Sequence, residues 1–413
     1  MEQSVNPALV ISFTPGRQAE AFRTRASYHP GIVTGVRKQF VLMRMKISLA
    51  WRIFMQYPNP VLLLKLIRGV RKQISDHTQE RGIKKLVKVD GKYFISLTMP
   101  GWPSAHFYRG FLSEAKSMLG KKADPSEHIR LALVAMTKKC PLRCEHCFEW
   151  AELNKKETLS DDHLRGIILK LQDAGVPQIQ LSGGEPLARI HTLLGLLQNS
   201  KGDSDFWIST SGFNLTEENA LRLKNAGLTG VAISLDHFDA GQHDRFRGYE
   251  GAFAAATEGA VRAKKAGLVV ALALVPTREF CTEGNLTSYM ELAARLGVDF
   301  VQLIEPRAVG HYAGKDVELK PAQERVLEDF FTRMNNDPFF AHLPLVHYYG
   351  MKQRRMGCAG SGHKYIYVDT DGAMSSCPYC RRKQVSLLDH SLDDAVLRMK
   401  EAGCVKFAPV QLM

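Results

Sequence analysis

The stretch LALVAMTKKCPLRCEHCFEW (131–150) joins an apolar run to a loop that contains three cysteines. The run LALVAMT (131–137) has no charged residue, which is typical of a strand buried on both faces of a sheet. Helical periodicity follows at 159–173, and the alternation of apolar run and amphipathic stretch then repeats along the chain. We therefore expect further elements, the strands at 178–182, 206–210, 231–235, 268–275 and 300–305 and the helices at 187–198, 215–226, 251–266 and 285–296.

Six strands that alternate with helices predict an α/β fold with a parallel sheet and right-handed crossovers. The carboxyl ends of parallel strands meet at one edge of the sheet, where ligands bind in such folds. The chemically distinctive residues of the chain follow these ends, namely Cys140–Cys147, SGGEP (182–186), TSG (210–212), Ser234, Asp236 and Glu305. The sequence thus predicts one functional site at this edge.

The composition is that of a globular protein, because 45% of the 413 residues are hydrophobic and 23% are charged. The length allows two or three domains. Eight cysteines are far too few for a secreted disulfide scaffold of this length, and no secretory signal is evident. Seven of them gather within 140–147 and 358–404, which favours metal ligation in a reducing, cytoplasmic compartment.

The net charge of +13 is concentrated in the N-terminal region, residues 1–125. This region holds 21 basic and 7 acidic residues, a net charge of +14, so the other 288 residues carry −1 (13 − 14). Within it, residues 46–74 interleave apolar and basic side chains, and Asn59-Pro60 is expected to interrupt the helix. Such a segment can bind anionic lipid at the inner face of a membrane, or it can pack on the body as a basic helix; both interpretations stay open. No nucleic-acid-binding module accompanies the charge, so no nucleic acid is expected.

The N-terminal region has three expected parts. Residues 1–44 are rich in arginine and poor in acidic residues, which is compatible with a mistaken upstream start, a flexible tail or a transit peptide. Residues 84–98 predict two strands around the turn Asp90-Gly91, and residues 105–119 predict a helix. We therefore expect residues 1–125 to form a basic extension with a small α/β cap.

The spacing Cys140-x3-Cys144-x2-Cys147 allows three kinds of site. Disulfides need an even number of partners and an oxidising compartment, and neither is indicated. A zinc site needs four ligands, and His146 lies next to Cys147 on a tight loop, where two adjacent side chains rarely reach one ion. An iron–sulfur cluster usually has four thiolates, so three on one loop would leave one iron open. Basic neighbours would favour the thiolates, namely Lys138, Lys139 and Arg143.

CPLRCEHC (140–147) resembles the CxxxCxΦC motif of radical S-adenosylmethionine (SAM) enzymes, with His146 at the usually aromatic position. Later segments also resemble that superfamily, namely LSGGEPL (181–187), WISTSG (207–212) and SLDHFDAGQHDRFRG (234–248). The resemblance covers about residues 130–306. It implies a partial (β/α)6 TIM-like barrel, which we place at 126–335.

The resemblance also implies the ligands of the site. Cys140, Cys144 and Cys147 would hold a [4Fe–4S] cluster, and SAM would bind its open iron. Ser234 and Arg247 would hold the SAM carboxylate, since a guanidinium can donate two parallel hydrogen bonds to it, and Asp236 would lie near the ribose. The full set of expected SAM-binding residues is Gly183, Gly184, Glu185, Pro186, Thr210, Ser211, Ser234, Asp236 and Arg247.

A second cysteine group lies in and after GCAGSGHKYIYVDTDGAMSSCPYC (357–380), where a hairpin is expected around Asp371-Gly372. The residues alone also permit a zinc hairpin. The segment resembles the C-terminal SPASM or twitch extension of radical SAM enzymes, which carries auxiliary [4Fe–4S] clusters. A full SPASM domain has seven cysteines, so the four present here imply a twitch-like domain at 336–413 with one auxiliary cluster, its ligands being Cys358, Cys377, Cys380 and Cys404.

The resemblance implies reductive cleavage of SAM to a 5′-deoxyadenosyl radical, which abstracts hydrogen from a substrate carbon. An electron donor such as a flavodoxin or ferredoxin would supply the electron. The expected substrate is a peptide or cofactor precursor that is oxidised or cross-linked, with Glu305 and His311 as candidate proton acceptors. Two alternatives stay open: a lipid or membrane-associated substrate, and a non-catalytic iron–sulfur electron carrier or zinc-stabilised binding module.

Overall fold

A computed structural model describes residues 31–56, 58, 64, 84–118, 124–360, 364–381, 384–399, 404, 406 and 407. Its main feature is a ten-stranded sheet with the order β10-β9-β8-β7-β6-β5-β4-β11-β12-β13. The central strands are β4 (Leu131–Ala135), β5 (Gln178–Ser182), β6 (Asp205–Thr210), β7 (Leu228–Ser234), β8 (Val269–Leu274) and β9 (Phe300–Leu303). These are the six predicted strands, and each lies parallel to its neighbour, which confirms the predicted α/β fold.

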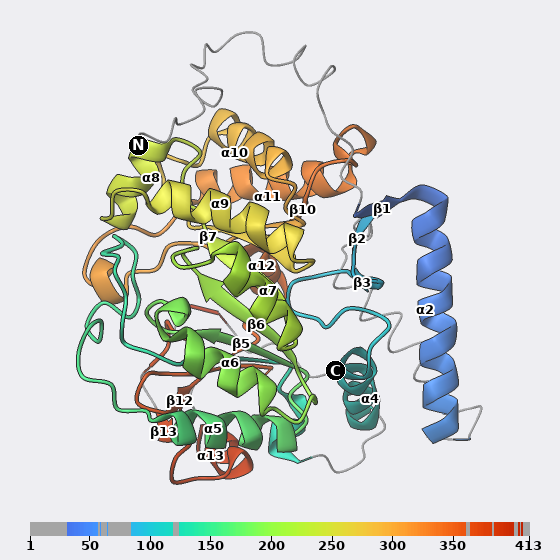
Figure 1. Cartoon of the computed structure of the whole chain (residues 1–413). Coiled ribbons are helices and arrows are strands. Elements are labelled where there is room, and N and C mark those ends of the chain that lie inside the picture. The colour runs from blue at the N-terminus through green and yellow to red at the C-terminus, as the bar shows by residue number, and fades with distance from the viewer. Residues whose placement is uncertain are drawn as a thin grey trace.

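Helices cover the outer side of this sheet, as Figure 1 shows for α5, α6, α7 and α9. Their bounds are α5 (Asp161–Asp173), α6 (Ile190–Gln198), α7 (Glu217–Asn225), α8 (Ala240–Arg247), α9 (Ala252–Lys265), α10 (Glu283–Arg295) and α11 (Pro321–Asn336). Side chains such as Leu164, Leu171 and Leu193 join the strand residues Val134 and Ile179 in one hydrophobic core. The sequence did not predict α8, because its residues AGQHDRFR offer no apolar face.

A three-stranded antiparallel sheet closes the amino end of the barrel. It consists of β1 (Ile32–Thr34), β2 (Lys85–Val89) and β3 (Lys92–Phe94), and the predicted turn at Asp90-Gly91 joins the last two. Val87 and Phe94 pack on Trp207 and Phe300, which lie near the starts of β6 and β9. Two helices, α2 (Gly35–Gln56) and α4 (Ala105–Met118), pack on this small sheet. The cap therefore lies opposite the edge that carries the predicted site, and Figure 1 shows α2 far from the loop that follows β4.

Residues 31–44 are part of the folded unit. Ile32 of β1 pairs with Val87 of β2, and α2 buries Val41. The expectation of a flexible tail over residues 1–44 is therefore wrong for 31–44, while residues 1–30 lie outside the described residues. Helix α2 ends at Gln56, and the expected break at Asn59-Pro60 also lies outside them.

Lys85 fastens β2 to the segment that precedes β10. Its ammonium is buried and donates to the carbonyls of Phe340, Leu343 and Pro344 at 3.3, 2.9 and 3.0 Å. We expect Lys85→Met to lower the free energy of unfolding by about 2–3 kcal/mol, because three carbonyls lose their donor while the aliphatic stem is kept. Urea titration measures this change. The matched control is Lys88→Met, at an exposed position three residues further along the same strand. It should change the free energy of unfolding by less than about 0.5 kcal/mol, and equal effects would contradict the assignment.

The C-terminal segment continues the main sheet at both of its edges. On one side β10 (Leu345–Tyr348) lies parallel to β9, and on the other β11 (Tyr365–Val368) lies parallel to β4. The hairpin predicted around Asp371-Gly372 is formed by β11 and β12. The remaining elements are β12 (Ala373–Ser375), β13 (Val385–Ser386), α12 (Tyr349–Met356) and α13 (Leu392–Met399). The expected division at residue 336 thus separates segments that share one sheet, and β11 places the second cysteine group beside the loop after β4.

Candidate active site

The loop after β4 brings its three cysteines together. Cys144 is buried, and Cys140 and Cys147 are half-buried against the same small apolar group, which includes Leu142 and Ala252. Burial raises the pKa of Cys140 to about 12 and that of Cys147 to about 12, and the neighbouring Cys144 adds to both effects. Thiols with raised pKa values stay protonated until a bound metal displaces the proton. This group therefore fits a site that is completed by metal binding.

The side chain of Asn154 closes the cysteine loop. Its Oδ1 accepts from the Cys140 N–H at 3.0 Å, and its Nδ2 donates to the Cys140 carbonyl at 3.0 Å. The Asn154 N–H also donates to the Lys138 carbonyl at 2.7 Å, from a left-handed backbone (φ 60°) that asparagine tolerates better than most residues. Sequence reasoning missed this clamp, although an asparagine shortly after a ligand loop is the signal that could have found it.

The glycine pair after β5 packs directly on the cysteine loop. A Cβ atom at Gly183 would lie 2.5 Å from the Thr137 carbonyl oxygen, and one at Gly184 would lie 2.2 Å from that of Lys139. The N–H groups of Gly184 and Glu185 donate to these two carbonyls at 2.7 Å each. Both glycines are therefore needed for the close approach of two loops, and these two N–H groups are not available for the SAM contact expected of this segment.

Glu185 joins the carboxyl ends of β5 and β6. Its buried carboxylate accepts from Thr210 Oγ1 at 2.6 Å and from the N–H and Oγ of Ser211 at 2.7 and 2.6 Å. Burial raises the pKa of Glu185, and these hydrogen bonds partly oppose the rise. Pro186 begins the short 3-10 helix η2 (Pro186–Arg189), which Glu185 caps. The structure thus brings these four predicted residues to one edge, and three of them are bonded to one another.

Asp236 and Arg247 form a buried ion pair after β7. Arg247 Nη2 lies 2.5 Å from Asp236 Oδ2, and the two side chains are 7% and 2% exposed. Burial raises the pKa of Asp236, but Arg247 and His146 outweigh it and hold this pKa below its ordinary value. Arg247 Nη1 also lies 3.4 Å from Cys144 Sγ, while its Nε is buried without a hydrogen-bond partner. These two predicted SAM ligands therefore also support the cysteine loop, whereas no hydrogen bond is described for the Ser234 side chain.

The end of α8 holds the cysteine loop through its last carbonyls. The N–H of Arg143 donates to the Arg247 carbonyl at 2.9 Å, and the N–H of Glu145 donates to that of Phe246 at 3.0 Å. His146 turns its Nε2 to Asp236 Oδ2, at 3.3 Å. The His146 ring therefore contacts a residue that lies shortly after the end of β7.

His243 supports Asp236 from α8, because its Nδ1 accepts from the Asp236 N–H at 3.0 Å. Burial lowers the pKa of His243 from 6.5 to about 4. The unfolded chain then binds this proton more tightly than the folded chain, so stability that is present above pH 6.5 is lost as the pH falls toward 4. We expect the protonation of His243 to lower the free energy of unfolding by about 2 kcal/mol as the pH falls from 7 to 5.

Urea denaturation at the two pH values measures this loss. His243→Asn keeps an acceptor near the position of Nδ1 and removes the titrating ring. The variant should therefore lose about 2 kcal/mol less than the parent chain over this interval. The same pH dependence in both chains would contradict the assignment to His243.

The loop after β9 makes a further contact with the cysteine loop. It contains the 3-10 helix η3 (Gly310–Tyr312), and the His311 N–H donates to the Cys147 carbonyl at 2.9 Å. The His311 ring lies with Nδ1 3.1 Å from the Cys144 carbonyl oxygen and stacks on Trp150, with centroids 3.8 Å apart. A Cβ atom at Gly310 would lie 2.2 Å from the Cys147 carbonyl oxygen. The structure therefore brings His311 to the cysteines.

Glu305 lies after β9 in a cluster of arginines. Its carboxylate accepts from Tyr348 Oη at 2.7 Å, from Arg354 Nη1 at 2.5 Å and from Arg307 Nη2 at 3.3 Å. Burial raises the pKa of Glu305, but Tyr348 and Arg354 outweigh it and lower this pKa. A carboxylate that two guanidinium groups hold in its ionised form is a weak base, so the geometry favours His311 over Glu305 as a proton acceptor.

Four side chains connect the two cysteine groups. We call their contact the inter-loop junction, and its members are Phe148, Glu149, Tyr379 and Arg381. Glu149 is buried and accepts from Arg381 Nη2 at 2.5 Å and from the Tyr367 hydroxyl. The rings of Phe148 and Tyr379 meet edge to face, with centroids 6.1 Å apart. Phe148 follows Cys147 directly, and Tyr379 lies between Cys377 and Cys380, so each side of the junction is adjacent to thiols.

Lys138 also spans the two groups. Its Nζ is buried and lies 2.7 Å from Asp371 Oδ1 and 3.6 Å from Glu152 Oε2. The expectation that Lys138 would favour the thiolates is therefore wrong, because its charge is balanced by the C-terminal hairpin. The guanidinium that does reach a thiol belongs to Arg247.

The four C-terminal cysteines lie near one another. Cys377 and Cys380 flank a tight turn in which the Cys380 N–H donates to the Cys377 carbonyl at 3.1 Å. The sulfur atoms of Cys380 and Cys404 are 3.9 Å apart. Burial raises the pKa of Cys404, and Cys358 and Cys380 raise it further. The structure thus brings Cys404, which is distant in sequence, to the cysteine group in which it was predicted to lie.

The donor chemistry of both groups fits iron–sulfur clusters. Three thiols occupy the loop after β4 and four occupy the second group, and thiolate is the ligand that such clusters take. Within the described ranges, no three His, Cys, Asp or Glu side chains converge on one point as the ligands of a single ion do. A four-iron cluster places each thiolate on a different iron, so its ligands surround a volume instead of a point.

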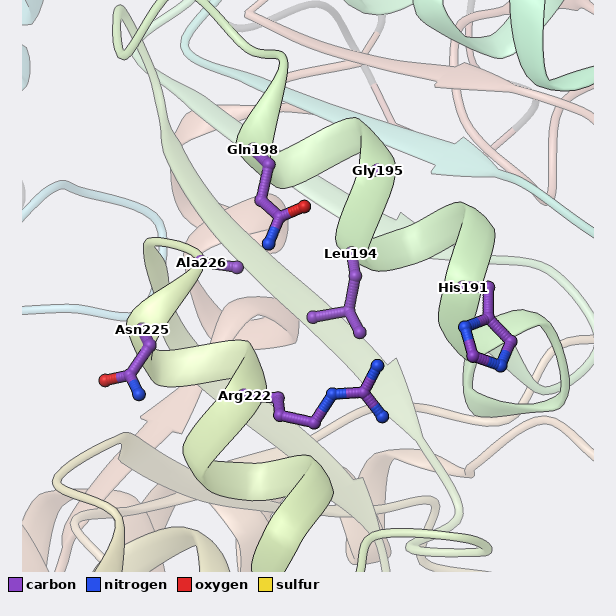
Figure 2. A pocket seen from close by; sticks show the side chains of 7 residues that line it. All are labelled: His191, Leu194, Gly195, Gln198, Arg222, Asn225 and Ala226. Atoms are coloured by element: carbon purple, nitrogen blue, oxygen red, sulfur yellow. The ribbon is translucent and has the colours of Figure 1, made fainter.

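Two surface depressions lie away from the cysteine loop. The smaller, about 370 Å³, lies between α6 and α7, and Figure 2 shows the residues that line it: His191, Leu194, Gly195, Gln198, Arg222, Asn225 and Ala226. The larger, about 720 Å³, lies where α2, α4, α5 and α13 meet, and its lining includes Arg52, Lys170 and Asp393. Neither of the two is lined by a predicted site residue.

Comparison with known proteins identifies related chains. Residues 134–279 match the Radical SAM superfamily. The chain is 28% identical over 284 residues to the AdoMet-dependent heme synthase of Nitratidesulfovibrio vulgaris, a match that covers 62% of this chain and 75% of that protein. It is 31% identical over 196 residues to the PqqA peptide cyclase of Rhizobium meliloti, a match that covers 47% of this chain and 52% of the cyclase.

The fold also matches a solved structure. Streptococcus suis SuiB bound to precursor peptide SuiA aligns with 78% of this chain and 76% of its own, with a TM-score of 0.52 and 13% sequence identity. At this identity the match concerns the fold alone. It confirms the partial barrel that the sequence predicted.

Proposed function

Since this chain belongs to the radical SAM superfamily, we propose that it abstracts hydrogen from a carbon of a peptide or of a cofactor precursor. The observation that supports this best is the cysteine loop itself. Three thiols lie in one group after β4, and segments that follow β5, β7 and β9 contact their loop, so four strand ends build one site. A SAM site at the carboxyl ends of the strands accounts for this convergence, whereas a structural metal site requires four ligands and no further groups from neighbouring strand ends.

Cys140, Cys144 and Cys147 would hold the [4Fe–4S] cluster, which, when bound, supplies the electron that cleaves SAM to methionine and a 5′-deoxyadenosyl radical. Asn154 holds the backbone of Cys140 at the start of the loop, and burial excludes water from Cys144. Arg247 beside Cys144 offsets negative charge on the thiolates.

The SAM site is proposed at the edge formed by the ends of β5, β6 and β7. Ser182 Oγ and Arg247 Nε are buried there without a hydrogen-bond partner, and buried polar atoms of this kind fit a polar ligand. Gly183, Ser234 and Asp236 adjoin them and remain candidate contacts. Glu185, with its bonds to Thr210 and Ser211, would position this edge, and Pro186 would start η2 behind it.

Cys358, Cys377, Cys380 and Cys404 are proposed to hold one auxiliary [4Fe–4S] cluster. Their proximity supports this assignment, and the inter-loop junction gives the two cysteine groups a fixed relative position. The auxiliary group would accept an electron from the substrate, which makes the net reaction an oxidation or a cross-link. His311, held at the cysteine loop, would accept the substrate proton.

The substrate class rests on the relatives. One is named a peptide cyclase and another a heme synthase, which supports a peptide or a cofactor precursor for this chain. A flavodoxin or ferredoxin is the proposed electron donor, and a reducing cytoplasm is the proposed compartment because clusters and their reductants persist there. A lipid substrate has less support, because the basic cap lies at the opposite end of the barrel from the site.

Anaerobic reconstitution tests the proposal. Iron and sulfide loading should give about eight irons per chain, four for each cluster. Addition of dithionite and SAM should then release 5′-deoxyadenosine. Cys144→Ala should retain about four irons and release no 5′-deoxyadenosine. Cys281→Ala removes a thiol outside both groups and should behave as the parent chain. A loaded parent chain that leaves SAM intact would instead support the electron-carrier alternative.

A further inference from the structure

The outward face of α2 displays a continuous row of exposed apolar side chains. Their spacing of three or four residues places them in line along one side of the helix. We call this row the outer stripe, and its members are Val36, Phe40, Met43, Ile47, Trp51 and Phe54, which are between 37% and 86% exposed. Single exposed apolar residues are ordinary on a protein surface, but six in line form a patch that indicates an interaction.

The fold does not need the outer stripe. The opposite side of α2 buries Val41, Met45, Leu49 and Ile53. That inner side packs on Leu86, Trp102, Phe107 and Tyr108 of the cap. Helix α2 is therefore apolar on two opposite sides, one of which already anchors it, and Figure 1 shows it at the periphery of the molecule.

The charge beside the stripe indicates what covers it. Helix α2 contains five basic residues and no acidic one, and no acidic residue occurs anywhere in 21–75. Helical geometry places Arg37 and Arg44 along one side of the stripe and Lys46 along the other, and all three are exposed. A second copy of the chain would bring these like charges face to face, whereas an anionic surface would pair with them.

We propose that the outer stripe binds the surface of an anionic lipid bilayer, with α2 lying in the plane of the membrane. The apolar row enters the acyl boundary, and Arg37, Arg44 and Lys46 contact lipid phosphates. In the described part of the chain every helix is too short or too polar to cross a bilayer. The proposal stands on α2 alone and does not depend on the radical chemistry.

The position of α2 also orients the enzyme. The cap closes the amino end of the barrel, and the cysteine loop lies at the other end. Docking through α2 therefore turns the candidate active site toward water. The bound enzyme takes its substrate from the aqueous side of the membrane, not from within the bilayer.

Vesicle flotation of the full-length chain tests the proposal. The probes are vesicles of phosphatidylcholine alone and of phosphatidylcholine with phosphatidylglycerol at about 7:3. The chain should float with the anionic vesicles. Ile47→Glu and Trp51→Glu should each reduce this binding about tenfold or more, since each removes a membrane-buried side chain. Leu221→Glu, at an apolar position of α7 that is 53% exposed, should bind as the parent chain does.

Two further measurements separate the contributions. Arg37→Gln and Lys46→Gln should each weaken binding to anionic vesicles about fivefold. Brominated lipids should quench the tryptophan fluorescence of the parent chain, and Trp51→Phe should lose that quenching while it still floats. The Trp51→Phe variant also tests the proposal if a glutamate variant does not fold.

The results that would overturn the proposal are specific. One is a parent chain that does not float with anionic vesicles. Another is a folded Ile47→Glu chain that floats as well as the parent. A third is a dimer in sedimentation velocity that Ile47→Glu converts to a monomer while vesicle binding is absent, since this would make the stripe a subunit interface.

Discussion

Gly184→Ala should abolish SAM cleavage by the reconstituted enzyme. The added methyl carbon would lie 2.2 Å from the Lys139 carbonyl oxygen and 3.1 Å from Cys140 Cβ. The first of these is a backbone atom, which cannot rotate away, so the cysteine loop must move off β5. We expect iron to fall from about eight to about four per chain. SAM cleavage should fall at least about 100-fold, because even small displacements at a reacting site have effects of this size.

The matched control is Gly195→Ala on α6. Nothing lies within 4 Å of a Cβ atom added there, and the residue is helical. We expect this variant to keep its iron and to gain about 0.5–1 kcal/mol of stability. If Gly184→Ala held eight irons and cleaved SAM at the parent rate, the close approach of β5 and the cysteine loop would not be what positions the thiols.

Asp236→Asn should lower the free energy of unfolding by about 3–5 kcal/mol, because it leaves the buried Arg247 guanidinium without its counter-charge. The substitution keeps the size of the side chain, so lost charge and not lost volume is tested. Urea denaturation of the metal-free chain measures the change. Asp316→Asn removes the carboxylate of an exposed ion pair with Arg278 and should have a much smaller effect.

A double-mutant cycle gives the sharper test. If the cost arises from an unpaired buried cation, then adding Arg247→Met to Asp236→Asn should restore part of the stability. Strictly additive losses in the two variants would show that Asp236 and Arg247 do not act as a pair.

Much of the barrel could be predicted because each central strand is an apolar run between turn residues. The six runs from 131 to 305 correspond to β4–β9, and the Asp90-Gly91 and Asp371-Gly372 turns form as expected. The cysteine ligands and the strand ends that meet at their loop could also be predicted. These features depend on local sequence, which a single chain displays directly.

The remaining features depend on contacts between distant residues. LVHY (345–348) is only four residues long, so its parallel pairing with β9 was not visible, and neither was the pairing of β11 with β4. The ion pairs of Lys138 with Asp371 and of Arg247 with Asp236 reassign charges that the sequence had placed elsewhere. Which partner balances a buried charge is decided by packing, not by spacing along the chain.

The pairing of β11 with β4 means that the second cysteine group is not a removable module. A chain that ended at residue 335 would leave the edge of β4 unpaired, would remove the nearer acidic partner of Lys138 and would leave Glu149 without Arg381. A simpler ancestor or an engineered minimal version would therefore need a rebuilt sheet edge before it could dispense with the C-terminal thiols. Removal of the second cysteine group would therefore also destabilise the loop that holds the first.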